Sequence, residues 1–238
     1  LVLSALDAVS GGWDYEDVFR CLKTGMAGLA PEECDLLENY VLKWEIRGAM
    51  WTREAPWTAH PDGYHAEVTE ESETRLAEIN RLRARVRTPL LALQRGMAQN
   101  PTACGRTETL YRFLTDLKLA DQLRSKTEAF RAAGEGKLAD EYAQLWDILC
   151  GVMDQMVFIL EDTPVELGEY VRLFRLVLTQ YDIGTIPAAL DQVSVAEITR
   201  NDRHTYPYVF FLGVNDHVLP AAPTAGGILT DSDRTELL

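Results

Sequence analysis

The segment Tyr208-Val-Phe-Phe-Leu-Gly-Val-Asn-Asp-His-Val-Leu-Pro220 decides the fold that the sequence predicts. Its apolar run, residues 209–212, lies between a proline and a glycine, a pattern typical of a β-strand that is buried on both faces. A second strand is predicted over residues 193–198, where apolar and polar residues alternate roughly. A buried strand needs neighbouring strands, and the chain shows no other convincing one. We therefore expect its partners to come largely from outside this chain.

The rest of the chain is predicted to be mainly helical. Apolar residues recur at spacings of three and four in the two longest patterns, which run from Thr69 to about Asn100 and from about Lys137 to Glu161. Pro89 is expected to kink or split the first of them near Thr88. Shorter helices are predicted over residues 1–9, 15–24, 31–43, 107–117, 122–133 and 167–179, with Asp14 and Thr107 as caps of two of them.

A segment rich in aromatic residues follows the helix predicted to end at Lys43. Trp44, Trp51 and Trp57 lie in a stretch that glycines and prolines interrupt, which predicts an irregular loop. Exposed rings there could stack on unpaired bases. Buried rings would instead anchor a loop that lacks regular structure, and this interpretation is favoured.

The charge balance opposes a broad DNA-binding face. The chain has 23 basic and 37 acidic residues and a formal net charge of −14, whereas each phosphate contact needs a cation. A local basic strip remains possible on the long helical pattern that begins at Thr69. Its members are Arg75, Arg81, Arg83, Arg85, Arg87 and Arg95. Because glutamates crowd the start of the same pattern, a solvated face of mixed charge is the favoured interpretation.

No complete catalytic or metal-binding motif is present in the sequence. There is no G-x-x-x-x-G-K-[ST], G-x-S-x-G or H-E-x-x-H, so we expect no catalytic residue and no complete ATPase here. His60 and His65 could flank a turn, but no further metal ligand stands nearby. The cysteines are scattered without a C-x-x-C pair and are expected to be reduced thiols. They are Cys21, Cys34, Cys104 and Cys150.

The sequence gives no sign of secretion or of a membrane. We see no apolar run of about 18 residues, and the start Leu1-Val-Leu lacks the basic region and cleavage site of a signal peptide. We therefore expect a cytoplasmic protein with no membrane contact. Because the chain starts without Met and stops inside the helical pattern at Thr235-Glu-Leu-Leu238, we expect an internal fragment of a longer protein.

The ending of the predicted strand resembles a known family. Gly213-Val-Asn-Asp-His-Val-Leu-Pro220 and Gly227-Ile-Leu-Thr-Asp-Ser-Asp-Arg-Thr-Glu-Leu237 are similar to the strand and loop that close the second motor domain of UvrD/Rep-type helicases. They are most similar to the AddB (RexB) family, the helicase-like B subunits of AddAB helicase-nucleases. Residues 13–25 and 35–41 resemble the same family. His217 stands where the family usually has Gly. The signature residues are Gly213, Asn215, Asp216 and Pro220.

The resemblance implies a mainly α fold, in which a helical insertion lobe is flanked by parts of an α/β, RecA-like second motor domain of UvrD/Rep-like type. Residues 1–24 are then an N-terminal piece of the motor-like domain, residues 25–180 the lobe, and residues 181–238 the returning α/β piece. The resemblance also implies that ATP, Mg²⁺ and an iron–sulfur cluster bind outside this region. It places the exonuclease activity of the parent protein in a domain beyond Leu238.

The resemblance further implies a role that is not catalytic. Active motors of this type carry Thr-Leu-His-x-x-Lys-Gly-Leu-Glu just before the strand. With the chain aligned on residues 209–213, the Thr, His, Lys, Gly and Glu of this active-motor motif are all replaced. The positions of Thr, His, Lys, Gly and Glu hold Glu197, Thr199, Asp202, Arg203 and Thr205. Asp202 stands where the motif has Lys, so the chain lacks a positive charge at the position that would contact DNA or phosphate.

We therefore expect a non-catalytic region of the B subunit of an ATP-dependent helicase/deoxyribonuclease, acting in double-strand break repair by homologous recombination. It would scan single-stranded DNA and dock to an AddA-like helicase-nuclease subunit in a heterodimer that also holds double-stranded DNA. Two alternatives stay open: part of an active superfamily 1 DNA helicase, or a purely protein-binding helical lobe. The residues predicted to contact the DNA backbone, or to form only a solvated connection, are Arg200, Asn201, Arg203 and His204.

Overall fold

The computed structural model describes residues 1–64, 66–181, 183 and 208–215. The chain divides into two units, Leu1–Ala188 and Ala189–Leu238, and each is described by itself. Among the described residues there are nine α-helices and, in place of a sheet, one isolated β-bridge between Thr102 and Pro164. The prediction of a mainly helical protein is confirmed, whereas the α/β flanks stay a prediction. The division at residue 24 also stays a prediction and falls inside the first unit.

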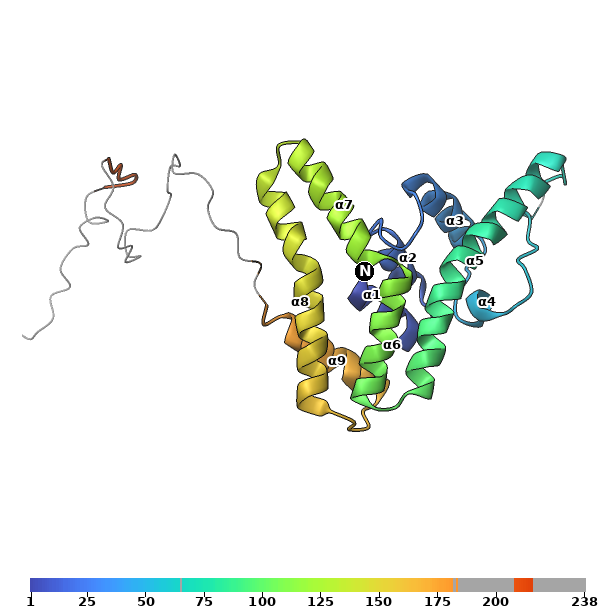
Figure 1. Ribbon diagram of the computed structural model, residues 1–238. Helices are drawn as coiled ribbons and strands as arrows, with labels where there is room; N and C mark the ends of the chain where they lie inside the picture. The colour runs from blue at the N-terminus through green and yellow to red at the C-terminus, as the bar shows by residue number, and fades with distance from the viewer. Residues whose placement is uncertain (65, 182, 184–207, 216–238) are drawn as a thin grey trace, which may run out of the picture. The chain divides into compact units, whose positions relative to one another are not determined.

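Most helices follow one another with short links, and the long exception is the link of residues 53–69 between the fourth and fifth helices (Figure 1). In chain order they are α1 (Val2–Ser10), α2 (Tyr15–Leu22), α3 (Pro31–Lys43), α4 (Ala49–Thr52), α5 (Glu70–Gln99), α6 (Ala103–Asp116), α7 (Leu119–Ala132), α8 (Gly136–Leu160) and α9 (Leu167–Leu178).

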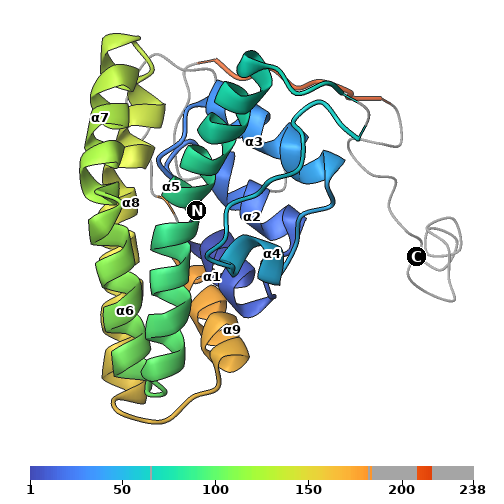
Figure 2. The ribbon, with the colours of Figure 1, turned by 90° about the vertical axis from the view of Figure 1, so that its right-hand side faces the viewer.

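The short helix α1 lies at the centre of the first unit. It packs against α2, α5 and α9, and its residues Ala5, Leu6 and Ala8 are completely buried. The long helices stand beside it, with α6 between α5 and α8 (Figure 1), and α7 and α8 pack against each other, as the view of Figure 2 shows with α8 behind α7. One continuous core joins residues from all of these helices. Burial of this apolar surface is the main term that stabilises the unit.

Helix α5 continues through Pro89, so the predicted split near Thr88 is wrong. A proline inside a helix removes one backbone hydrogen bond and costs about 3 kcal/mol. Apolar residues on both sides of the proline face the same core, since Val86 is 1 % exposed and Leu90 is 3 % exposed. Their burial keeps both halves of the helix in one core and offsets that cost.

Helix α6 begins one turn earlier than predicted, and its cap is Thr102 rather than Thr107. The Thr102 hydroxyl accepts a hydrogen bond from the Gly105 N–H at 3.2 Å. The N–H of Ala103 donates to the carbonyl of Thr163 at 3.0 Å, so the link between α8 and α9 also caps this helix. Thr107 lies inside α6. The Thr163 carbonyl is distant along the sequence and leaves no local signal, whereas Thr102 is a local cap that the prediction missed.

Helix α8 is long and apolar enough to span a membrane by length and composition alone, although no apolar run of that length was predicted. Its buried residues Val152, Met153 and Met156 face the core, and half-buried Leu145 and Leu149 pack against it. This packing covers only part of the helix, since 17 % of its most apolar 18-residue window is buried. Two apolar residues of the pattern predicted from about Lys137 to Glu161, which was expected to place them on the buried face, are exposed: Leu138 at 37 % and Ile159 at 60 %.

Candidate functional site

The residues predicted to contact DNA, Arg200, Asn201, Arg203 and His204, lie outside the described residues, as do Asp216 and Pro220 of the predicted signature. The other two signature residues, Gly213 and Asn215, are described. Gly213 has a φ of +74°, a conformation that glycine adopts without strain. The N–H of Asn215 donates to the carbonyl of Gly213 at 2.9 Å. The signature therefore begins with a tight three-residue turn.

The apolar run before this turn is exposed. Phe210 is 86 % exposed and Leu212 is 94 % exposed, and the described residues 208–215 form no strand. The predicted burial is therefore not reached within the described part of the chain. Contiguous exposed apolar side chains of this kind mark a surface that another protein segment covers.

Most arginines of the predicted basic strip are engaged within the protein. Arg81 lies 2.6 Å from Glu78 and 3.2 Å from Glu33, and Arg85 lies 2.6 Å from Glu33. Arg75 lies 2.9 Å from Asp62 and 3.0 Å from Glu71. Arg95 is exposed.

The two glutamates beside Arg81 and Arg85 accept hydrogen bonds that favour their ionised form. The pKa of Glu33 is lowered from its usual range chiefly by the Ala30 N–H and then by Arg85, and the pKa of Glu78 chiefly by Arg81. Each carboxylate is therefore kept ionised beside its arginine. These arginines neutralise the chain's own acids and offer little free positive charge to a phosphate.

Two further arginines of the strip hold the aromatic loop in place. Arg83 is 4 % exposed and donates to the carbonyls of Trp51 at 3.1 Å and Ala55 at 2.8 Å, as well as to that of Arg53. Its guanidinium lies 4.8 Å from the centre of the Trp57 ring. Arg87 donates twice to a carbonyl of the same loop. The interpretation as a solvated face is therefore wrong for Arg83, which is buried and bonded to backbone.

The predicted irregular loop contains the short helix α4, which includes Trp51, and its aromatic residues pack inside the protein. Trp51 and Trp57 are at most 1 % exposed, and their ring centres lie 5.1 Å apart. Tyr40 of α3 stacks on Trp57 at 5.3 Å. The packing interpretation is confirmed for these two tryptophans, because buried rings offer no face to a base. Trp44 is half-buried, and Tyr64, whose ring lies 4.4 Å from it, is 85 % exposed.

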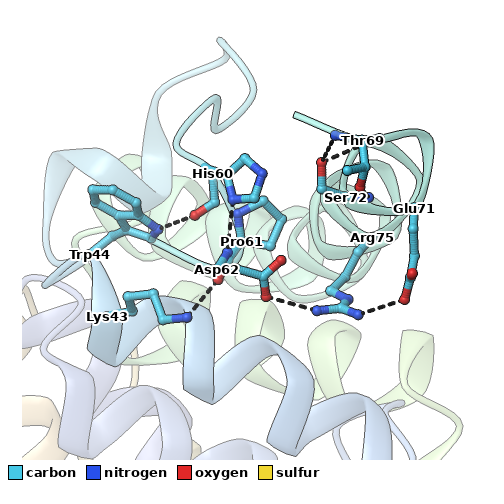
Figure 3. A network of polar contacts seen from close by, with 9 residues as sticks. All are labelled: Lys43, Trp44, His60, Pro61, Asp62, Thr69, Glu71, Ser72 and Arg75. Atoms are coloured by element: carbon cyan, nitrogen blue, oxygen red, sulfur yellow. Dashed lines mark hydrogen bonds and ion pairs between the residues drawn. The ribbon is translucent and has the colours of Figure 1, made fainter. Parts of the chain in front are cut away.

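Polar contacts tie the far end of this loop to the helices on either side (Figure 3). The Lys43 ammonium donates to the carbonyl of Pro61 at 2.7 Å, and the Trp44 indole N–H donates to that of His60 at 3.1 Å. Asp62 accepts from Arg75 of α5. The loop is thus bound to α3 on one side and to α5 on the other.

The described residues do not fit a metal centre. They contain no group of three or more His, Cys, Asp or Glu side chains that could hold an ion. Cys21 and Cys34 are buried, and burial raises the pKa of the Cys21 thiol to about 11. Cys104 and Cys150 are half-buried. His65, the predicted neighbour of His60, lies outside the described residues.

The sequence comparisons connect this geometry to known proteins. No family model matches the chain. It is 40 % identical over 235 residues to the B subunit of the ATP-dependent helicase/deoxyribonuclease of Clostridium botulinum (strain Loch Maree / Type A3), an alignment that covers 98 % of this chain and 20 % of the relative. The B subunit of Ruminiclostridium cellulolyticum is 36 % identical over 241 residues, with 100 % of this chain and 21 % of the relative covered.

A third relative, the B subunit of Acetivibrio thermocellus, is 37 % identical over 238 residues, and the alignment covers 100 % of this chain and 21 % of the relative. The chain thus spans about a fifth of the length of the curated relatives it matches. Their shared name describes one subunit of an ATP-dependent helicase and deoxyribonuclease. The predicted resemblance is therefore confirmed: over nearly its whole length, this chain is a homologue of one segment of the helicase-like B subunits.

Proposed function

We propose that the chain acts as a non-catalytic region of the B subunit of an ATP-dependent helicase/deoxyribonuclease in double-strand break repair by homologous recombination. It would hold single-stranded DNA for scanning and dock to the partner helicase-nuclease subunit, in the cytoplasm. The observation that carries this proposal is the similarity of nearly the whole chain to about one fifth of each B subunit. The sequence lacks a phosphate-cradling G-x-x-x-x-G-K-[ST] motif, which supports a role without ATP hydrolysis.

In this proposal ATP, Mg²⁺ and the iron–sulfur cluster bind to other parts of the parent protein. The exposed apolar run around Phe210 supports a larger parent protein, since such a run needs a cover.

DNA contact is assigned in this proposal to Arg200 and Arg203, assisted by Asn201 and His204. Contacts of this kind position the DNA backbone and read no sequence. Arg83 of α5 donates to loop carbonyls and is not free to bind a phosphate, so α5 offers no free basic strip as a competing DNA contact. This supports, indirectly, the assignment of DNA contact to Arg200 and Arg203.

The test is fluorescence anisotropy of a labelled single-stranded oligonucleotide titrated with this chain at low and at higher salt. Saturable binding that weakens steeply with salt is expected, because each neutralised phosphate releases counterions. Arg200→Ala/Arg203→Ala should abolish binding. The matched control, Arg112→Ala/Arg124→Ala, removes two exposed arginines of α6 and α7 and should leave binding unchanged. Absence of binding at low salt would overturn the DNA contact.

A purely protein-binding helical lobe is the second candidate. The net charge of −14 and the engagement of most α5 arginines by the chain's own acids and carbonyls favour it. Calorimetric titration with the purified partner subunit separates the two candidates. Tight binding to the partner together with no binding to the oligonucleotide would favour the protein-binding lobe.

A further inference from the structure

Three arginines come together where the short helix α4 packs against α5 (Figure 1). Arg53 is the C-cap residue of α4, and Arg83 and Arg87 lie one turn apart on α5. Arg83 donates to the carbonyl of Arg53, and Arg87 donates twice to the carbonyl of Thr52, at 2.7 and 3.1 Å. The end of α4 is thus held directly beside two guanidinium groups.

No carboxylate pairs with these three arginines within the described part of the chain. The chain has 37 acidic residues against 23 basic ones, and three other arginines of α5 do pair with its acids. The pKa of Arg83 is lowered, first by burial and then by the positive charges of Arg87 and Arg53. The three charges therefore act on one another, and their repulsion favours an anion beside them.

Capping of α4 accounts for only part of this positive charge. The last carbonyls of a helix together carry about half a negative charge, far less than three guanidinium groups supply. Arg83 is almost completely buried, and its Nε–H has no acceptor although its other nitrogens are bonded to carbonyls. Arg53 is exposed, and its side chain makes no hydrogen bond to the described residues. Positive charge thus remains beyond what the carbonyls balance.

Free donors of this group lie at the protein surface. Two nitrogens of Arg87 are bonded to the Thr52 carbonyl, whereas its Nη1 has no partner among the described residues and is accessible to solvent. The guanidinium of exposed Arg53 is equally free within the described part of the chain. An anion at this point would therefore meet donors from two arginines, with the charge of buried Arg83 behind them.

We propose that Arg53 and Arg87 bind a phosphate group, whose negative charge the buried Arg83 also stabilises. Guanidinium groups present planar sets of donors that match the oxygens of a phosphate, which offers more acceptors than a carboxylate. The phosphate group belongs either to the DNA backbone or to free phosphate, and the two experiments below separate these sources. As a DNA contact it would be a single point that supplements Arg200 and Arg203, not a strip along α5.

The first test is thermal melting of the whole chain in chloride, acetate and inorganic phosphate at one ionic strength and neutral pH. Saturating phosphate should raise the melting temperature by about 3 °C. Arg53→Gln should lose this rise, apart from the general effect of phosphate on apolar burial. Arg95→Gln removes another exposed arginine of α5 that has no partner among the described residues, and should keep the full rise. An equal phosphate effect in the two variants, or an equal effect of acetate, would overturn the proposal.

The second test identifies the source of the phosphate group, and it alone rests on the proposed function. In the oligonucleotide titration, the slope of log affinity against log salt should become shallower by about 0.7 in Arg53→Gln, because one phosphate contact is lost, and stay unchanged in Arg95→Gln. An unchanged slope together with a lost phosphate effect on melting would exclude the DNA backbone and assign the site to free phosphate. If the parent chain binds no oligonucleotide, the proposed DNA contact fails, while the melting temperatures still decide whether the phosphate site exists.

Discussion

The loop between α3 and α5 and the segment around Gly213 make an instructive comparison, because both are rich in large apolar side chains and neither belongs to a long regular element. In the loop, Trp51 and Trp57 are buried, and Arg83 donates hydrogen bonds to the backbone carbonyls of Trp51 and Ala55. In the other segment Phe210 and Leu212 are exposed. Apolar content therefore does not decide burial. The loop finds its packing partners in α3 and α5, whereas the side chains of residues 208–215 are exposed within the described part of the chain.

The largest expected effect on stability follows from removing a buried tryptophan ring from the loop. Trp57→Ala should lower the free energy of unfolding by about 4 kcal/mol, because removing a buried ring that contacts Tyr40 and Trp51 leaves a cavity. Urea denaturation followed by circular dichroism measures the change. Trp44→Ala, at a half-buried position of the same segment, should cost clearly less. Equal costs at the two positions would contradict the proposed anchoring.

A somewhat smaller loss is expected when the arginine that holds the loop is removed. Arg83→Met should lower the free energy of unfolding by about 3 kcal/mol, since it leaves the carbonyls of Trp51 and Ala55 without their donor while keeping most of the side-chain volume. Arg124→Met removes an exposed arginine of α7 and is the control. If both variants unfold at the same denaturant concentration, Arg83 does not anchor the loop.

A third, smaller loss of stability is expected when the N-terminal cap of α5 is removed. Thr69→Ala should cost about 1 kcal/mol, because the Thr69 hydroxyl accepts from the Ser72 N–H at 3.2 Å while the Ser72 hydroxyl accepts from the Thr69 N–H at 2.9 Å. Thr74→Ala removes an exposed hydroxyl one turn further on and serves as the reference in the same denaturation series. A Thr69 variant as stable as the reference would show that this cap contributes nothing.

The smallest effect on stability is expected in the exposed segment. Phe210→Ser/Leu212→Ser should change the free energy of unfolding by less than about 0.5 kcal/mol, because both side chains are exposed already. The same variant should bind less of a dye that fluoresces on apolar surfaces. A large loss of stability would show instead that this segment is buried in the isolated chain, as the loop is.

Much of the helical fold was predictable, and the reasons are local. The predicted helix from Pro31 to Lys43 agrees with α3 at both ends, since a first-turn proline and acidic residues mark its start. The predicted N-cap Asp14 does precede α2. Long-range partners were not predictable. Nothing near Arg83 in the sequence shows that it bonds to loop carbonyls about thirty residues away, and the glutamates at the start of the same pattern suggested a solvated face of mixed charge.

The candidate site was predictable to a smaller extent. The turn at Gly213 agrees with the predicted end of the apolar run, because a positive φ demands glycine there. The residues predicted to contact DNA, Arg200, Asn201, Arg203 and His204, lie outside the described residues, so their assignment stays a prediction.

Hydrogen exchange followed by mass spectrometry shows whether the loop finds its partners inside this chain while the segment around Gly213 does not. In the isolated chain, amides of residues 49–60 should exchange slowly, and those of residues 208–215 should exchange at once. In the full-length parent protein, residues 208–215 should become protected. Rapid exchange across residues 49–60, or slow exchange across residues 208–215 in the isolated chain, would contradict this difference between the two regions.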